Sequence, residues 1–257
     1  MKKIIPLILT VILSGCLKIG EYYAGMTMQP ELNENDAVEG LNIFGVLKAG
    51  PSLDTACCFF EVQQLLFIHG NYDSMCVDQA EINLTRKTVL GEISNFELNS
   101  LGDCLYYNGN LKTDYGDKWN IVCNYDTFEV RSECIIPGKP LIEQIKIDDS
   151  SNIISFSVLY DSTASMYNAY LISADSFYIE KRVPEKGVDT KFSINPGWET
   201  KDKSISLFLF AYDKNLEQYQ TTSNIFFKPN AYRPCYTTVE GGYGTFGAIS
   251  SSYQLLR

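Results

Sequence analysis

Apolar and polar residues alternate with a period of two along most of this chain after residue 40. Such alternation predicts β-strands that bury one face. In the first half we expect strands at Leu41–Lys48, Cys57–Ile68, Ala80–Thr88 and Asn95–Asn99, and then a hairpin of Trp119–Tyr125 and Phe128–Ile136. Asp126-Thr127 supplies the turn of that hairpin.

A second series of strands follows the segment Ile135-Ile136-Pro137-Gly138-Lys139-Pro140. Its prolines cannot donate to a strand ladder, so we interpret this segment as a linker. The expected strands are Leu141–Ile147, Asn152–Tyr160, Met166–Ser173, Ser176–Arg182, Thr190–Ile194, Ser204–Tyr212 and Gln218–Phe227. Only Glu61–Ile68 and Asn215–Thr222 offer a helical alternative.

The strand Ser204–Tyr212 is apolar on both faces. One face carries Leu207 and Leu209, and the other carries Phe208 and Phe210. This pattern indicates either a central strand or a strand with one face directed to a partner.

The spacing of strand starts favours an all-β fold of two consecutive β-sandwiches, Ig-like or prealbumin-like, behind a flexible tether. We expect the first sandwich at 37–136, the second at 141–233, and a glycine-rich tail at 234–257 that forms a loop packed on the second. The tail contains a GxGxxG run, Gly242-Tyr243-Gly244-Thr245-Phe246-Gly247. A dinucleotide site would need this run to open a helix within a βαβ unit, so we interpret it as a chance match.

The N-terminus has the form of an export signal. Lys2 and Lys3 precede an apolar run, and Leu13-Ser14-Gly15-Cys16 follows it. Small residues before a cysteine resemble the lipobox of bacterial lipoproteins. This resemblance implies that residues 1–15 form a signal peptide and that Cys16 receives diacylglyceryl and palmitate-type acyl chains. Each buried methylene of such chains contributes about 0.8 kcal/mol, so two or three chains anchor a protein durably.

The charge of the chain narrows the choice of partners. The formal net charge is −10, and removal of Lys2 and Lys3 with the signal makes it about −12. An acidic surface repels phosphate backbones, so nucleic acid is an unfavourable partner. We expect acylated Cys16 to hold the chain to the bilayer and residues 16–36 to form the tether.

Cysteines other than Cys16 number seven, which in an exported protein suggests disulfides with at least one thiol left over. The candidates, with pairing left open, are Cys57, Cys58, Cys76, Cys104, Cys123, Cys134 and Cys235. The sequence has no CxxC pair and only one histidine, so we expect no metal site and no cofactor.

Catalytic motifs are missing from the sequence. His69 is the only imidazole and stands where a strand gives way to a turn; neither GxSxG nor HExxH occurs. We therefore expect no enzyme. Two carboxylates could still act on a glycan, and 31 acidic residues leave that alternative open. The acids Asp103, Asp114, Asp117, Asp148 and Asp149 are turn residues first and candidate Ca²⁺ ligands second.

Aromatic residues make up 13% of the chain. They favour strands, but exposed ones can also stack on sugars or bury at protein interfaces. The candidate aromatic binding face is Tyr106, Tyr107, Tyr115 and Trp119.

The order of several segments resembles a family of Bacteroidota outer-membrane lipoproteins catalogued as a domain of unknown function. The segments are the lipobox, Val38-Glu39-Gly40-Leu41, Ile135-Ile136-Pro137, and a GGxGxFGA-type tail at Gly241-Gly242-Tyr243-Gly244-Thr245-Phe246-Gly247-Ala248. The resemblance implies an outer-membrane lipoprotein, often associated with a transporter, and no established catalytic residue. Only Cys16 and the tail motif carry over by position.

The sequence thus favours a non-catalytic lipoprotein that acts as an accessory or binding module at the outer membrane, with a transporter or another envelope protein as partner. A glycan-acting hydrolase or carbohydrate-binding lipoprotein is the alternative, and a structural envelope protein is the second. Leu17 and Lys18 follow Cys16. Because no aspartate stands directly after the cysteine, we expect the outer membrane, with the periplasmic face slightly favoured over the cell surface.

Overall fold

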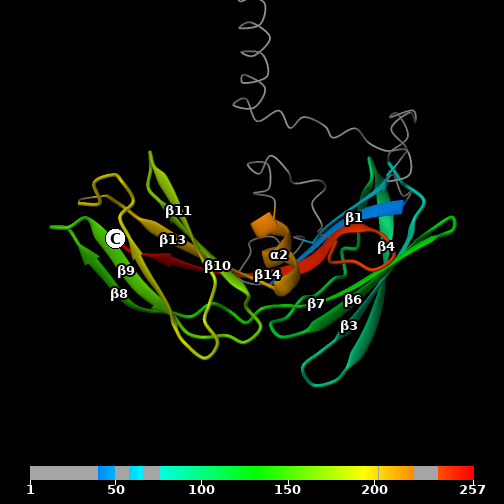
Figure 1. Cartoon of the computed structure of the whole chain (residues 1–257), viewed down its shortest axis with the longest axis horizontal. Coiled ribbons are helices and arrows are strands. Elements are labelled where there is room, and N and C mark those ends of the chain that lie inside the picture. Colours follow the sequence, from blue (N-terminus) through cyan, green and yellow to red (C-terminus); the bar gives the residue numbers. More distant parts are fainter. Residues whose placement is uncertain (1–39, 50–57, 66–75, 202, 223–236) are drawn as a thin grey trace, which may run out of the picture.

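The computed structural model describes residues 40–49, 58–65, 76–201, 203–222 and 237–257 (Figure 1). These residues form an all-β fold with one short helix. The elements are β1 Gly40–Ala49, β2 Phe59–Leu65, β3 Glu81–Lys87, β4 Ile93–Gly102, β5 Leu105–Tyr107, β6 Lys118–Tyr125, β7 Phe128–Ile135, β8 Ile142–Asp148, β9 Ile153–Val158, β10 Met166–Ile172, β11 Phe177–Arg182, β12 Thr190–Ile194, β13 Ser206–Tyr212, α2 Lys214–Thr222 and β14 Tyr243–Leu255.

The first half of the fold is a sandwich whose two layers are joined by β4. In one layer, the end of β4 pairs with β5, and the strand order continues from β5 to β2, β1 and β14. In the other layer, the start of β4 pairs with β3, and the strand order continues from β3 to β6 and β7. Both layers contribute to one apolar core, which includes Ile43 from β1 and Ile121 from β6. Hydrophobic burial between these layers therefore stabilises the first half.

The second half is a smaller sandwich. The strands β12, β9 and β8 form one sheet, and β11, β10, β13 and the end of β14 form the other layer. Phe156 and Phe192 stack between neighbouring strands of the first layer, with ring centroids 4.7 Å apart. They pack in one core with Leu171 and Leu209 of the second layer.

The C-terminal strand β14 belongs to both sandwiches. Its first part pairs in parallel with β1, from Tyr243 opposite Asn42 to Ser250 opposite Ala49. Its last part pairs antiparallel with β13, from Ile249 to Leu255. Figure 1 shows β14 in red crossing from the β1 side of the molecule to the β13 side. One sheet of 11 strands therefore runs continuously through both halves.

Helix α2 covers the outer face of this continuous sheet where the halves meet. Leu216 of the helix packs with Met166 and Tyr212, and Val46 and Ile249 border the same small core. The helix begins after Asp213, whose carboxylate accepts a hydrogen bond from the Leu216 N–H at 3.0 Å, which is the usual N-cap contact.

Hydrogen bonds from the first turn of α2 pin the helix to strands of the first half. The Asn215 side chain donates to the Glu133 carbonyl at 2.8 Å and to the Phe246 carbonyl at 2.7 Å. The helix and β14 therefore tie the two halves together.

Most sequence-based strands are confirmed, including the β6–β7 hairpin around Asp126. Residues 59–65 form a strand, as expected within Cys57–Ile68, and not the helical alternative. Two expectations need correction. Residues 214–222 form a helix, as the alternative allowed, and not the start of the strand expected at Gln218–Phe227. The tail was expected to be a loop packed on the second sandwich, but residues 243–255 form β14, which pairs with β1 as well.

The GxGxxG run therefore lies at the start of a strand and opens no helix. Gly244 has a φ of +99°, and a Cβ there would overlap the Ile43 carbonyl oxygen, so glycine is needed for the close approach of β14 to β1. The expected linker, 135–140, stands between β7 and β8, and the Gly138 N–H donates to Asp161 at 2.7 Å.

Candidate functional site

The outer face of the second half carries a continuous row of apolar and aromatic side chains. Directly opposed residues of an antiparallel pair lie on the same face of a sheet. Tyr170 is opposite Ile179 and Phe208, and Phe208 is in turn opposite Tyr253. Leu171 and Leu209, which alternate with these residues, point into the core, so the row faces outward.

Large parts of this row are exposed. Phe177 is 71% exposed, Leu255 56% and Tyr253 52%, and Ile172 and Ile179 are each 40% exposed. We call the seven residues of this surface the outer apolar face: Tyr170, Ile172, Phe177, Ile179, Phe208, Tyr253 and Leu255. Scattered apolar residues are normal on a protein surface, whereas a contiguous group of them is less common.

Aromatic side chains of the outer apolar face contact neighbouring rings. The rings of Phe208 and Tyr253 are 4.8 Å apart between centroids, and Tyr170 meets Phe210 edge to face at 5.4 Å. The outward positions of these four strands include Lys181 and no acidic residue. In a chain with a net charge of −10, this face is a place where another protein can approach without burying a carboxylate.

The aromatic face predicted from sequence is not an exposed cluster. Trp119 is fully buried and packs against Phe96 with ring centroids 5.5 Å apart. Tyr106 is 3% exposed, and Tyr107 and Tyr115 are half-buried. The prediction is wrong for Tyr106 and Trp119, because their strands turn these side chains into the first core. No shared exposed surface is left for the four residues.

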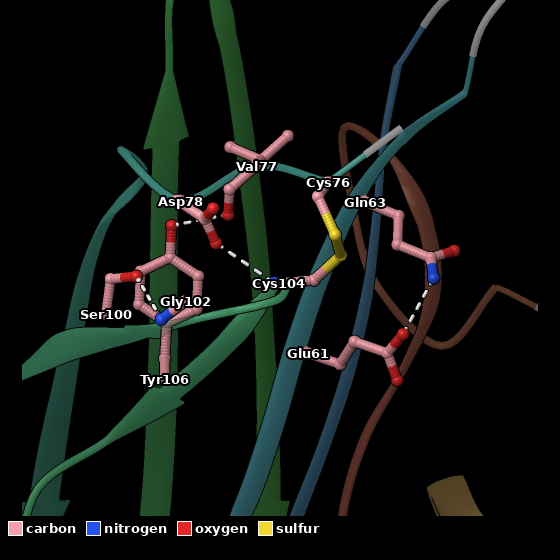
Figure 2. Close-up of a disulfide and its surroundings, with 9 residues drawn as sticks. All are labelled: Glu61, Gln63, Cys76, Val77, Asp78, Ser100, Gly102, Cys104 and Tyr106. Atoms are coloured by element: carbon pink, nitrogen blue, oxygen red, sulfur yellow. Dashed lines mark hydrogen bonds between the residues drawn. A yellow bond between two sulfur atoms is a disulfide. The ribbon is translucent and has the colours of Figure 1, made fainter. Parts of the chain in front are cut away.

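Tyr106 instead joins β5 to the segment after Cys76, as Figure 2 shows. Its hydroxyl donates to the Val77 carbonyl at 2.7 Å and accepts from the Ala80 N–H at 2.8 Å. Burial raises the pKa of this phenol. These bonds satisfy buried polar groups, and they give Tyr106 a structural role.

One of the expected disulfides is present: Cys76 is bonded to Cys104, with Cα atoms 4.7 Å apart (Figure 2). Beside it the Cys104 N–H donates to Asp78 at 3.0 Å. Cys123 and Cys134 are buried thiols, and burial raises the pKa of Cys123 to about 12 and that of Cys134 well above its usual value. Thiols with such pKa values are poor nucleophiles.

Several predicted residues lie outside the described part of the chain: Cys16, Cys57, His69 and Cys235. Cys58 is described and is half-buried directly before β2.

The candidate Ca²⁺ ligands have other partners. Arg86 forms ion pairs with Asp114 and with Asp117, and Asp117 is almost fully buried. Asp148 accepts hydrogen bonds from Ser150 and Ser151, which lower its pKa to about 2. Among the described residues no group of three or more metal-ligating side chains comes together.

Asp149 and Asp103 complete the set of turn acids. Asp149 pairs with Arg257 at 2.9 Å, which connects the β8–β9 turn to the C-terminus. Asp103 lies in the β4–β5 turn with a φ of +52°. Both positions are explained by turn geometry. Within the described ranges, no helix is long and apolar enough to cross a bilayer.

Comparison with known proteins names no family for this chain. No family model matches it, and no curated protein matches it. Among solved structures, a two-domain fibronectin type-III segment of chicken tenascin is similar at 11% identity and a TM-score of 0.27, over 86% of this chain and 99% of that one. A bacterial ice-binding adhesin matches at 9% identity and a TM-score of 0.26, over 87% and 65%.

Proposed function

We propose that this chain is a non-catalytic lipoprotein that binds another envelope protein at the outer membrane through its outer apolar face. Acylated Cys16 anchors it to the bilayer on the periplasmic side. The partner is an outer-membrane transporter or another protein of the envelope. The outer apolar face is the observation that carries the proposal.

The position of the face on the fold supports this function. Phe208 and Phe210 alternate with the core residues of β13, so the strand is apolar on both sides, as its sequence indicated. Burying exposed apolar area is worth roughly 25 cal/mol per Å², and such gain is available only when a partner covers the face. Aromatic residues are the side chains most enriched where interfaces gain their binding energy.

The N-terminal sequence supports the anchoring. A lipobox, a net charge that repels anionic headgroups, and no basic cluster after Cys16 leave acyl chains as the means of attachment. Anchoring keeps the folded part near membrane proteins, which raises its effective concentration for a partner in the same membrane.

Co-purification from gently solubilised native membranes tests this function. The wild type is compared with Cys16→Ala, with the double variant Phe177→Ser and Tyr253→Ser, and with Val89→Ser. Val89 is a matched control, because it is 73% exposed but lies in the β3–β4 turn of the first half. We expect one envelope protein with the wild type and with Val89→Ser. It should be lost with Cys16→Ala and depleted with the double variant.

Two results would overturn the proposal. One is that nothing co-purifies although the lipidated protein is abundant. The other is that the double variant retains the same partner in the same amount as Val89→Ser.

A further inference from the structure

A polar groove lies on the outer face of the first half, away from the outer apolar face. It has a volume of about 170 Å³. Its walls come from β1, β2, α2 and the start of β14, with Asn42, Phe44, Glu61, Gln63, Tyr219 and Gly244 as the lining residues. Pockets that enclose a drug-sized ligand measure roughly 300–1,000 Å³, so this groove has room for a single ring.

A hydrogen bond between two side chains fixes the polar side of the groove. The Gln63 amide donates to the Glu61 carboxylate at 2.7 Å, and both side chains lie along β2 (Figure 2). This bond uses one carboxylate oxygen and one amide hydrogen. The other carboxylate oxygen and the Gln63 carbonyl remain as acceptors, and the Asn42 side chain lines the same groove.

The opposite side of the groove is aromatic. Phe44 of β1 and Tyr219 of α2 are in contact, with ring centroids 5.6 Å apart and planes inclined by 56°. Tyr219 is 38% exposed. The face of an aromatic side chain can stack against the C–H face of a sugar ring.

Backbone features hold these side chains in place. Gly244 keeps the floor of the groove open, because a Cβ there would overlap the Ile43 carbonyl and lie 2.7 Å from the Asn42 side-chain oxygen. Gln63 pairs with Cys76, so the Cys76–Cys104 disulfide braces the strand next to the polar side. Groups fixed in this way lose little entropy when a ligand binds.

We propose that this groove binds one ring of a neutral glycan. The Glu61 carboxylate accepts hydrogen bonds from sugar hydroxyls, and the amides of Asn42 and Gln63 both donate and accept them. The Tyr219 ring covers the apolar face of the sugar. None of the described residues that line the groove is basic, and such a lining disfavours a phosphate or a carboxylate ligand.

Binding, and not hydrolysis, suits the groove. Glycoside hydrolysis requires two carboxylates roughly 5–10 Å apart across the scissile bond. Glu61 is the single carboxylate among the lining residues that the structure describes. This site is separate from the proposed protein-binding face, and either can exist without the other.

Saturation-transfer NMR tests the proposal with the full-length chain in a detergent that lacks a sugar headgroup. The probes are the methyl glycosides of glucose, galactose, mannose and N-acetylglucosamine, each at about 20 mM because one ring binds weakly. We expect saturation transfer to at least one of these glycosides. Tyr219→Ala and Glu61→Gln should each weaken the affinity about tenfold or more, as expected for lost stacking and for a lost charge-assisted hydrogen bond.

Tyr253→Ala is the matched control, because Tyr253 is an exposed tyrosine on the same sheet but outside the groove. It should leave the transfer unchanged, and thermal unfolding should show that all variants are folded. The proposal is overturned if no glycoside receives saturation, or if the signal persists unchanged in Tyr219→Ala and Glu61→Gln.

Discussion

Phe208 on β13 and Tyr253 on β14 lie directly opposite each other, with ring centroids 4.8 Å apart, on the face of the sheet that points away from the core. A cross-strand aromatic pair contributes roughly 0.2–1 kcal/mol to folding. That is far less than burial of either ring would give, so the fold itself gains little from placing aromatic rings here. A partner that covers the pair gives both residues a role.

Removing one ring of this pair should cost little stability. We expect Tyr253→Ala to lower the free energy of unfolding by about 1 kcal/mol or less, because the side chain is 52% exposed. Phe246→Ala on the same strand should cost about 3–5 kcal/mol, because Phe246 is fully buried and stacks with Phe60. Urea denaturation of the two variants measures the difference. Equal losses would show that Tyr253 belongs to the core.

Gly247 is the point on β14 against which α2 packs. A Cβ there would lie 2.5 Å from Leu216 Cγ and 2.7 Å from the Asp213 carboxylate, so Gly247→Ala should displace the start of the helix. We expect a loss of about 1–3 kcal/mol in the free energy of unfolding. Ser251→Ala, also on β14, is the control and should change it by less than about 0.5 kcal/mol. A neutral Gly247→Ala variant would argue against this helix position.

The disulfide should contribute strongly to the first half. Cys76 and Cys104 are 28 residues apart, and closing a loop of this length stabilises the fold by about 3–4 kcal/mol in the chain-entropy account. The double variant Cys76→Ala and Cys104→Ala should therefore lose that amount, measured by urea denaturation. Wild-type protein kept in a reductant should show a similar loss. If the reductant destabilises the double variant just as much, another cysteine pair is responsible.

Asp213 should make stability fall as the pH rises from about 4 to about 7. Burial raises the pKa of its carboxyl to about 7, although backbone N–H groups of Leu216, Ala248 and Asn215 oppose the shift. The folded state therefore holds a proton that the unfolded state releases near pH 4. The stabilising contribution is complete below that pH, is lost as the pH rises through 7, and amounts to at most about 4 kcal/mol.

Asp213→Asn is the control for this titration, because asparagine also caps a helix and does not ionise. Cys134 lies near Asp213, but its raised pKa keeps the thiol protonated over this range. We expect the difference in unfolding free energy between wild type and Asp213→Asn to fall between pH 4 and pH 7. Parallel pH profiles of the two proteins would contradict a raised pKa for the Asp213 carboxyl.

The strands could be predicted from sequence wherever a core imposes the period of two. The β6–β7 hairpin and the two apolar faces of β13 are examples. The alternation also placed Trp119 on one face with Ile121 and Cys123. That signal could have shown that Trp119 belongs to the core and not to an exposed cluster.

Contacts distant in sequence could not be predicted. The strand β14 begins in a glycine-rich segment of low strand propensity, and it forms because β1, some two hundred residues earlier, pairs with it. The outer apolar face likewise joins residues of β10, β11, β13 and β14. The exposed Phe177 and Tyr253 meet there only through the register of these strands.

Site-specific photocrosslinking in intact cells tests the binding face most directly. A benzoylphenylalanine placed at Tyr253 or at Phe177 should give a discrete adduct with one envelope protein, and Cys16→Ala should abolish that adduct. The same probe at Val89, exposed on the first half, should give none. No adduct from Tyr253 and Phe177 in cells with abundant lipidated protein, or an identical adduct from Val89, would contradict the proposed role of the outer apolar face.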